Sequence, residues 1–128
     1  MKKLTWLIIW FFAMLVLSWC GAQTTIETVS SPAIIELATC LTNNGATFYG
    51  TERCPHCKDQ KRLFGEAMSQ VNYIDCDQNG PVCQWAWVKG YPTWIFADGW
   101  ELVGMQTLEA LAVKAGCSFA PEALIPQG

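Results

Sequence analysis

The sequence predicts one α/β domain built on a mixed sheet. Short apolar runs alternate with stretches of helical period, which is typical of α/β domains. Asp98-Gly99 lies between two apolar runs and favours the tight turn of an antiparallel hairpin. A Cys-x-x-Cys motif at 54–57 stands between a predicted strand and a predicted helix. The chain of 128 residues is long enough for one small domain.

The first helix of the domain is expected from Pro32 to Asn43-Asn44-Gly45, a helix-ending sequence. Its apolar residues recur at helical spacing, at Ile34, Ile35, Ala38 and Leu41. A strand follows at 46–50. We expect a linker at 23–34, the domain at 35–120 and a tail at 121–128.

A second helix is expected to begin at or near Cys54 and to end near Ser69. Pro55 suits its first turn, where the missing N–H costs nothing. The apolar positions are Leu63, Phe64, Ala67 and Met68, and charged residues, Lys61 among them, fill the other face.

The remaining elements are predicted as a strand at 71–76, a helix at 80–88, strands at 92–97 and 100–104, and a helix from Thr107 to Gly116. Strand 71–76 is expected to run parallel to strand 46–50. The hairpin strands are antiparallel, and the predicted sheet is therefore mixed.

Residues 1–22 have the layout of a secretory signal: two lysines, an apolar run at 4–17, and small residues up to Ala22. Two alternatives remain open. Leu17-Ser18-Trp19-Cys20 is similar to a lipoprotein cleavage box, which would leave Cys20 lipidated, and the run also has about the minimum length of a membrane anchor. Each interpretation places the domain outside the cytoplasm, in the periplasm or at the outer face of the cytoplasmic membrane.

The charge distribution argues against one class of partner. Residues 1–22 hold two of the eight basic residues and none of the eleven acidic ones, which leaves six against eleven and a net charge of −5. There is no basic patch or run of like charge. Nucleic acid is therefore not expected to bind.

The Cys54-Pro55-His56-Cys57 motif indicates thiol chemistry. A sulfur at a helix N-terminus faces unsatisfied N–H donors and the positive end of the helix dipole, which favour the thiolate. Cys54 is therefore expected to be the nucleophile, with His56, the single histidine, adding positive charge or a hydrogen bond. Cys57, one turn inward, is expected to resolve a mixed disulfide. This chemistry needs no metal or organic cofactor.

Other interpretations of the motif stay open. It can be half of a zinc site, although such sites usually bring a second close pair, and Cys76 and Cys83 have six residues between them. It can also be a structural disulfide, although so small a ring constrains little of the unfolded chain. His56 alone can be an ordinary surface residue.

The longer pattern resembles the thioredoxin-like domain fused to bacterial homologues of vitamin K epoxide reductase (VKOR). The resemblance covers about residues 35–117 and implies a three-layer thioredoxin-like fold, with a central mixed sheet flanked by helices and a missing or very short first strand. It is carried by Phe48-Tyr49-Gly50, Cys54-Pro55-His56-Cys57, Asp59-Gln60-Lys61, Leu63-Phe64-Gly65, Tyr73, Cys76, Cys83 and Gly90-Tyr91-Pro92-Thr93-Trp94.

The same resemblance implies a cis peptide before Pro92, against the active disulfide, where Tyr91 and Thr93 bind an extended substrate. Proline at this position also removes a possible metal ligand. The family often has a buried carboxylate six residues before the first cysteine, and here Phe48 holds that position. Glu52 is nearer to that cysteine but is expected to be exposed, which leaves the proton acceptor open.

The expected function is that of an extracytoplasmic thiol-disulfide oxidoreductase acting on protein thiols. The motif resembles that of the periplasmic oxidant DsbA, which favours oxidation, although sequence alone does not fix the redox direction. The resemblance also implies a membrane quinone reductase of the VKOR or DsbB type, acting in trans on a monomer. The alternative is a non-catalytic, disulfide-stapled binding module that docks a membrane or secreted protein.

Six cysteines follow residue 22, an even number that invites three bridges in an oxidising compartment. If the motif cysteines pair with each other, strand topology puts Cys76 and Cys83 at the active-site edge. Cys40 and Cys117 follow helices that return to the opposite edge. We therefore expect Cys76–Cys83 as an electron relay or docking surface and Cys40–Cys117 as a structural bridge, with buried free thiols as the alternative.

Overall fold

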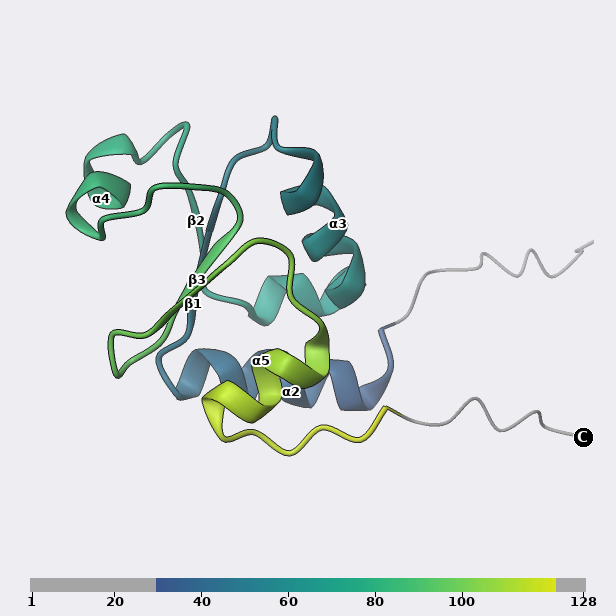
Figure 1. The fold of residues 1–128 in the computed structure, drawn as a ribbon. Coiled ribbons are helices and arrows are strands. Elements are labelled where there is room, and N and C mark those ends of the chain that lie inside the picture. The colour runs from purple at the N-terminus through teal and green to yellow at the C-terminus, as the bar shows by residue number, and fades with distance from the viewer. Residues whose placement is uncertain (1–29, 122–128) are drawn as a thin grey trace, which may run out of the picture.

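The computed structural model describes residues 30–121, which form a three-layer α/β domain (Figure 1). Its helices are α2 (Pro32–Asn43), α3 (Pro55–Phe64), the 3-10 helix η1 (Gly65–Gln70), α4 (Gly80–Trp85) and α5 (Leu108–Ala115). Its strands are β1 (Thr47–Gly50), β2 (Tyr73–Asp75), β3 (Thr93–Ile95) and β4 (Glu101–Val103). The element order is the predicted one, and within this range no strand precedes α2.

The sheet is mixed, as predicted, with the strand order β2-β1-β3-β4. Strand β1 runs parallel to β2 and antiparallel to β3, and β3 pairs antiparallel with β4. On β1, Phe48 lies opposite Tyr73 of β2 and Trp94 of β3. Because β1 is an inner strand, the chain that leaves its carboxyl end starts between two neighbours and leads directly to Cys54.

The two faces of the sheet carry different layers. Phe48 and Trp94 stack with their ring centroids 4.9 Å apart and pack in one core with residues of α2, α3 and α5. Tyr49 points to the other face, where it packs with Cys76 and Cys83 under α4. Figure 1 shows α4 across the strands from α3. The alternation of side chains along β1 therefore explains both layers.

Two predicted helices end earlier than expected. The helix after Cys54 does not continue to Ser69, because Gly65 takes a φ of +55° and the chain tightens into η1. Helix α4 ends at Trp85 rather than near Val88, and Trp87 then adopts a φ of +59°. Both changes in direction depend on a left-handed residue that apolar periodicity does not reveal.

The domain begins before the predicted boundary at 35. Ser30 is buried, and its Oγ donates to Phe64 O at 2.6 Å and accepts the N–H of Ala67 at 3.0 Å. Helix α2 then starts at Pro32. These contacts tie residues 30–34 to the join between α3 and η1, so the predicted linker 23–34 extends too far into the domain.

None of the helices between residues 30 and 121 has the length and apolar character needed to cross a membrane. The predicted signal or anchor at 1–22, including Cys20, lies outside the described residues, as does most of the predicted tail.

Candidate active site

Cys54 caps the N-terminus of α3, as the motif predicted. Its backbone is extended, with φ −80° and ψ 118°, and its Sγ accepts the N–H of Cys57 at 3.3 Å. Pro55 fills the first helical position. The sulfur is half-buried, so it combines access from solvent with the hydrogen-bond donors of a helix start.

Cys57 lies one turn inward and is fully buried. Burial raises the pKa of its thiol to about 12, and its hydrogen bond with Cys54 adds to the rise. Cys54 and Cys57 are the free cysteines between residues 30 and 121. The pair therefore consists of one sulfur that a partner can reach and one that is shielded and protonated at neutral pH.

The loop before β3 forms the second wall of the site. The Tyr91–Pro92 peptide is cis, which the resemblance had implied. The carbonyl oxygen of Tyr91 accepts a hydrogen bond from Cys54 Sγ at 3.7 Å, and Pro92 is fully buried behind it. The Pro92 carbonyl in turn accepts the N–H of Gly104 at 2.8 Å. The cis-proline loop is thus fixed to β4 and faces the half-buried sulfur.

Two further predicted site residues, Thr93 and His56, differ in exposure. Thr93 is fully buried, and its Oγ1 donates to Gly90 O at 2.8 Å. Its side chain therefore orders the loop, and substrate binding at Thr93 stays a prediction. His56 is exposed on the first turn of α3, and its expected effect on Cys54 stays a prediction.

A charged cluster beside Cys57 was not expected from the sequence. Lys61 Nζ forms an ion pair with Glu52 and lies 3.9 Å from the ring centroid of Tyr73. The Tyr73 hydroxyl donates to Glu52 Oε1 at 3.3 Å. Lys61 lowers the pKa of Glu52, while burial raises that of Tyr73. The sequence signal is the spacing of four between Cys57 and Lys61, which puts both on one side of a helix.

Gly50 explains how closely Cys57 approaches β1 and β2. A Cβ at this position would lie 3.0 Å from Cys57 Sγ and 3.3 Å from Cε2 of Tyr73. The absence of a side chain at the carboxyl end of β1 therefore lets the buried sulfur and the tyrosine ring both pack against this strand end.

The structure contains both expected bridges, Cys76–Cys83 and Cys40–Cys117. Cys76 and Cys83 are buried between the sheet and α4, so a partner thiolate has no access to them in this structure. The expected role of this pair as an electron relay or docking surface stays a prediction. The bond holds α4 to the end of β2, and it leaves these two cysteines without thiolates for a zinc site shared with the motif.

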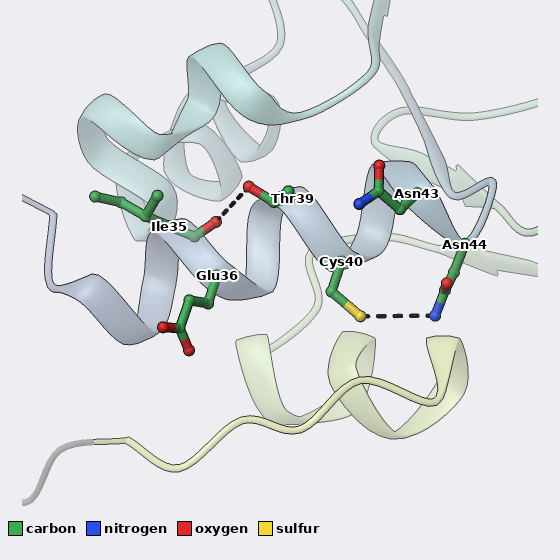
Figure 2. Close-up of a pocket in the computed structure, with 6 residues that line it drawn as sticks. All are labelled: Ile35, Glu36, Thr39, Cys40, Asn43 and Asn44. Atoms are coloured by element: carbon green, nitrogen blue, oxygen red, sulfur yellow. Dashed lines mark hydrogen bonds between the residues drawn. The ribbon is translucent and has the colours of Figure 1, made fainter.

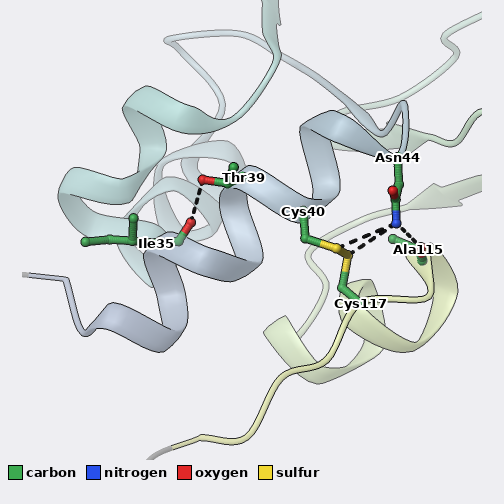
Figure 3. The surroundings of a disulfide bond; sticks show 6 residues. All are labelled: Ile35, Thr39, Cys40, Asn44, Ala115 and Cys117. Carbon is green, nitrogen blue, oxygen red and sulfur yellow. Dashed lines mark hydrogen bonds between the residues drawn. A yellow bond between two sulfur atoms is a disulfide. The ribbon is translucent and has the colours of Figure 1, made fainter.

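The other bridge lies at the opposite end of the sheet. Cys40 of α2 is bonded to Cys117, just after α5, and Figure 3 shows Asn44 beside both sulfurs. Its Nδ2 lies 3.6 Å and 3.7 Å from them and donates to Ala115 O at 2.8 Å. Asn44 precedes β1, whereas Cys54 follows it, so this bridge is remote from the motif.

The outer face of α2 bears a shallow pocket of about 380 Å³ (Figure 2). Its lining residues are Ile35, Glu36, Thr39, Cys40, Asn43 and Asn44. Cys40 is held in its bridge, so the pocket offers no free thiol. The thiol chemistry of the described domain therefore belongs to the α3 site.

A four-stranded mixed sheet with helices on both faces, carrying a Cys-x-x-Cys at the start of a helix and a facing cis-proline, is a thioredoxin-like fold. No family model matches the chain. The chain is similar to thiol-disulfide oxidoreductase LTO1 of Arabidopsis thaliana, with 39% identity over 106 residues. The match covers 76% of this chain but 28% of LTO1, so the chain spans little more than a quarter of that relative. The similarity supports a redox domain.

Proposed function

We propose that this chain is an extracytoplasmic thiol-disulfide oxidoreductase that exchanges disulfides with protein thiols through Cys54 and Cys57. The observation that carries the proposal is the asymmetric dithiol at the start of α3. A reachable sulfur caps the helix, and a fully buried sulfur stands directly behind it. The similarity to a thiol-disulfide oxidoreductase supports the same chemistry.

In the oxidising direction, a substrate thiolate attacks Cys54 of the oxidised pair. The Cys54–Cys57 bond breaks, and Cys57 leaves as a thiolate and takes up a proton. A second substrate thiolate then attacks the substrate sulfur of the mixed disulfide and releases Cys54. The substrate loses two electrons, and the pair gains them. The Tyr91 carbonyl beside Cys54 places the attached substrate against the cis-proline loop.

Repeated oxidation requires an acceptor for these electrons. We propose a membrane quinone reductase of the VKOR or DsbB type as this acceptor. The support is the resemblance of the sequence to VKOR-linked domains and the signal-like or anchor-like pattern of residues 1–22. Two bridges besides the motif also fit an oxidising compartment, where disulfides persist.

A non-catalytic binding module is the second candidate. The observation that favours it is the exposure of Trp85 and Trp87, 87% and 78%, beside a pocket of about 330 Å³ that Pro81 and Gln84 also line. Exposed aromatic side chains are typical of contact surfaces. In this candidate the motif cysteines would not turn over.

Trapping of intermediates tests the proposal and separates it from the second candidate. The Cys57→Ala chain keeps the nucleophile Cys54 but cannot resolve a mixed disulfide, so it should accumulate mixed disulfides with thiol proteins. Cys54→Ala should accumulate none, because the remaining sulfur is buried. Alkylation, non-reducing electrophoresis and mass spectrometry of the trapped bands measure the outcome. Equal trapping by both variants contradicts the assigned roles, and trapping by neither favours the binding module.

A further inference from the structure

We infer that Lys61, held in place by Glu52 and Tyr73, is a positioning residue that stabilises the thiolate of Cys57 when Cys57 resolves a mixed disulfide. This inference rests on the proposed function, in which Cys57 is the resolving thiol. It assigns a role to a charged cluster that otherwise has none in the exchange reaction.

Resolution requires an anion at a fully buried sulfur. The thiolate is the nucleophile, and burial of a charge without a partner is costly. The groups around Cys57 are Cys54 on its own helix, the backbone of Thr51, and Tyr73 on β2. A negative charge on Cys54 opposes ionisation of Cys57, whereas the Lys61 ammonium favours it. Lys61 is thus the cation that acts on this sulfur.

Lys61 and Cys57 lie on the same side of α3. Lys61 follows Cys57 by one helical turn, and its Nζ lies over the ring of Tyr73 at 3.9 Å from the centroid. The same ring and the Cys57 sulfur both flank Gly50, with Cε2 and Sγ 3.3 Å and 3.0 Å from the position that a Cβ would take there. The tyrosine ring therefore contacts the ammonium and lies beside the same glycine as the sulfur.

The two partners of the ion pair differ in exposure. The Lys61 side chain is 22% exposed, whereas that of Glu52 is 58% exposed. Water therefore screens the carboxylate more than the ammonium. Of the other charges at the cluster, Lys58 is exposed and acts on Glu52, and Asp75 acts on Tyr73. Of the charges that act on Cys57, the Lys61 ammonium is the one that favours its ionisation, and its effect is smaller than that of burial or of Cys54.

In the resolving step, water carries the protons, so that atoms and charges balance. The Cys57 thiol gives its proton to water, and the thiolate attacks Cys54 Sγ. The Cys54–Cys57 bond forms while the bond from Cys54 to the substrate sulfur breaks. The substrate departs as a thiolate, takes a proton from water and carries away the electron pair. Lys61 keeps its proton throughout.

Stopped-flow release of an aromatic thiolate tests the inference on the full chain, reduced and kept in mild detergent. An equimolar aromatic disulfide at mildly acidic pH gives one thiolate when Cys54 attacks and a second when Cys57 resolves. Lys61→Met should slow the second release roughly tenfold and move its pH profile upward by about one unit, since a nearby opposite charge shifts a pKa by 1–3 units. Lys61→Arg should restore the wild-type profile.

Lys58→Met is the matched control, because it removes the same charge from an exposed position of the same helix. It should leave both releases at the wild-type rate, and near-ultraviolet circular dichroism shows whether each variant is folded. If Lys61→Met resolves like wild type, or Lys61→Arg is as slow as Lys61→Met, the inference is wrong and the proposed function stands. If the wild-type chain releases only one thiolate, both are wrong.

Discussion

At the residue scale, the two motif sulfurs differ because of their places on one helix turn. Cys54 ends an extended segment and receives an N–H from the helix that it caps. Cys57 points into the core behind β1, where burial raises the pKa of its thiol to about 12. A partner thiolate can reach only the first sulfur. The roles of nucleophile and resolving thiol therefore follow from position, although both residues are cysteines.

Gly50→Ala tests how tightly this sulfur is packed. The new methyl group would lie 3.0 Å from Cys57 Sγ and 3.3 Å from the Tyr73 ring, so neighbouring atoms must shift. We expect a loss of about 1–3 kcal/mol in the free energy of unfolding, the usual cost of overpacking. Urea denaturation of the reduced chain measures it. Gly80→Ala is the control, because its methyl group would meet open space. Equal stability of both variants would show that the space behind Gly50 is not filled.

At the element scale, apolar spacing and turn residues were sufficient to predict the order of helices and strands. They could not predict the break at Gly65, because the sign of φ leaves no trace in hydrophobic periodicity. The cis peptide at Pro92 came from the resemblance, since an average X-Pro bond favours trans. The sequence places Lys61 on the charged face of its helix. Only the structure shows that Tyr73, on β2, covers part of this face.

Ser30→Ala tests the connection between the start of α2 and the join of α3 with η1. The serine satisfies a backbone carbonyl and a backbone N–H at this join, and it is itself buried. Its loss should lower the free energy of unfolding by about 1–3 kcal/mol, the cost of leaving buried polar groups unpaired. Ser69→Ala is the control, because that exposed hydroxyl bonds only to Glu66 nearby. Denaturant unfolding curves measure the free energy of unfolding of each variant. A loss for Ser30→Ala that is no larger than the loss for Ser69→Ala contradicts this role.

At the scale of the whole molecule, the two bridges beyond the motif act at opposite ends of the sheet. Cys40–Cys117 joins the first and last helices of the described domain across 77 residues of sequence. Cys76–Cys83 spans 7 residues and lies under α4. Strand topology was sufficient to predict both pairings, because it fixed which end of the sheet each cysteine reaches. It could not predict burial of the second pair, which depends on how α4 packs.

Replacing Cys40 and Cys117 by Ala should lower the free energy of unfolding by roughly 4 kcal/mol, because the closed loop is long. Thiolate release by Cys54 should stay near the wild-type rate, since the bridge is remote from α3. Replacing Cys76 and Cys83 should cost roughly 2–3 kcal/mol on the same loop-entropy argument. Thermal and urea unfolding measure both. A collapse of the fold without Cys76–Cys83, together with no loss without Cys40–Cys117, would reverse this division.

Graded reduction of the oxidised full chain, followed by alkylation and mass spectrometry, tests the central claim most directly. The claim is that Cys54 and Cys57 form the exchanging pair of a domain whose other bridges are structural. At the mildest reductant that opens any bridge, we expect alkyl groups on Cys54 and Cys57 alone, because a reductant reaches the half-buried Cys54 first. Cys40–Cys117 and Cys76–Cys83 should open only under strong reduction or denaturation. Resistance of all three pairs to the same strength of reductant would contradict the claim and favour a stapled binding module.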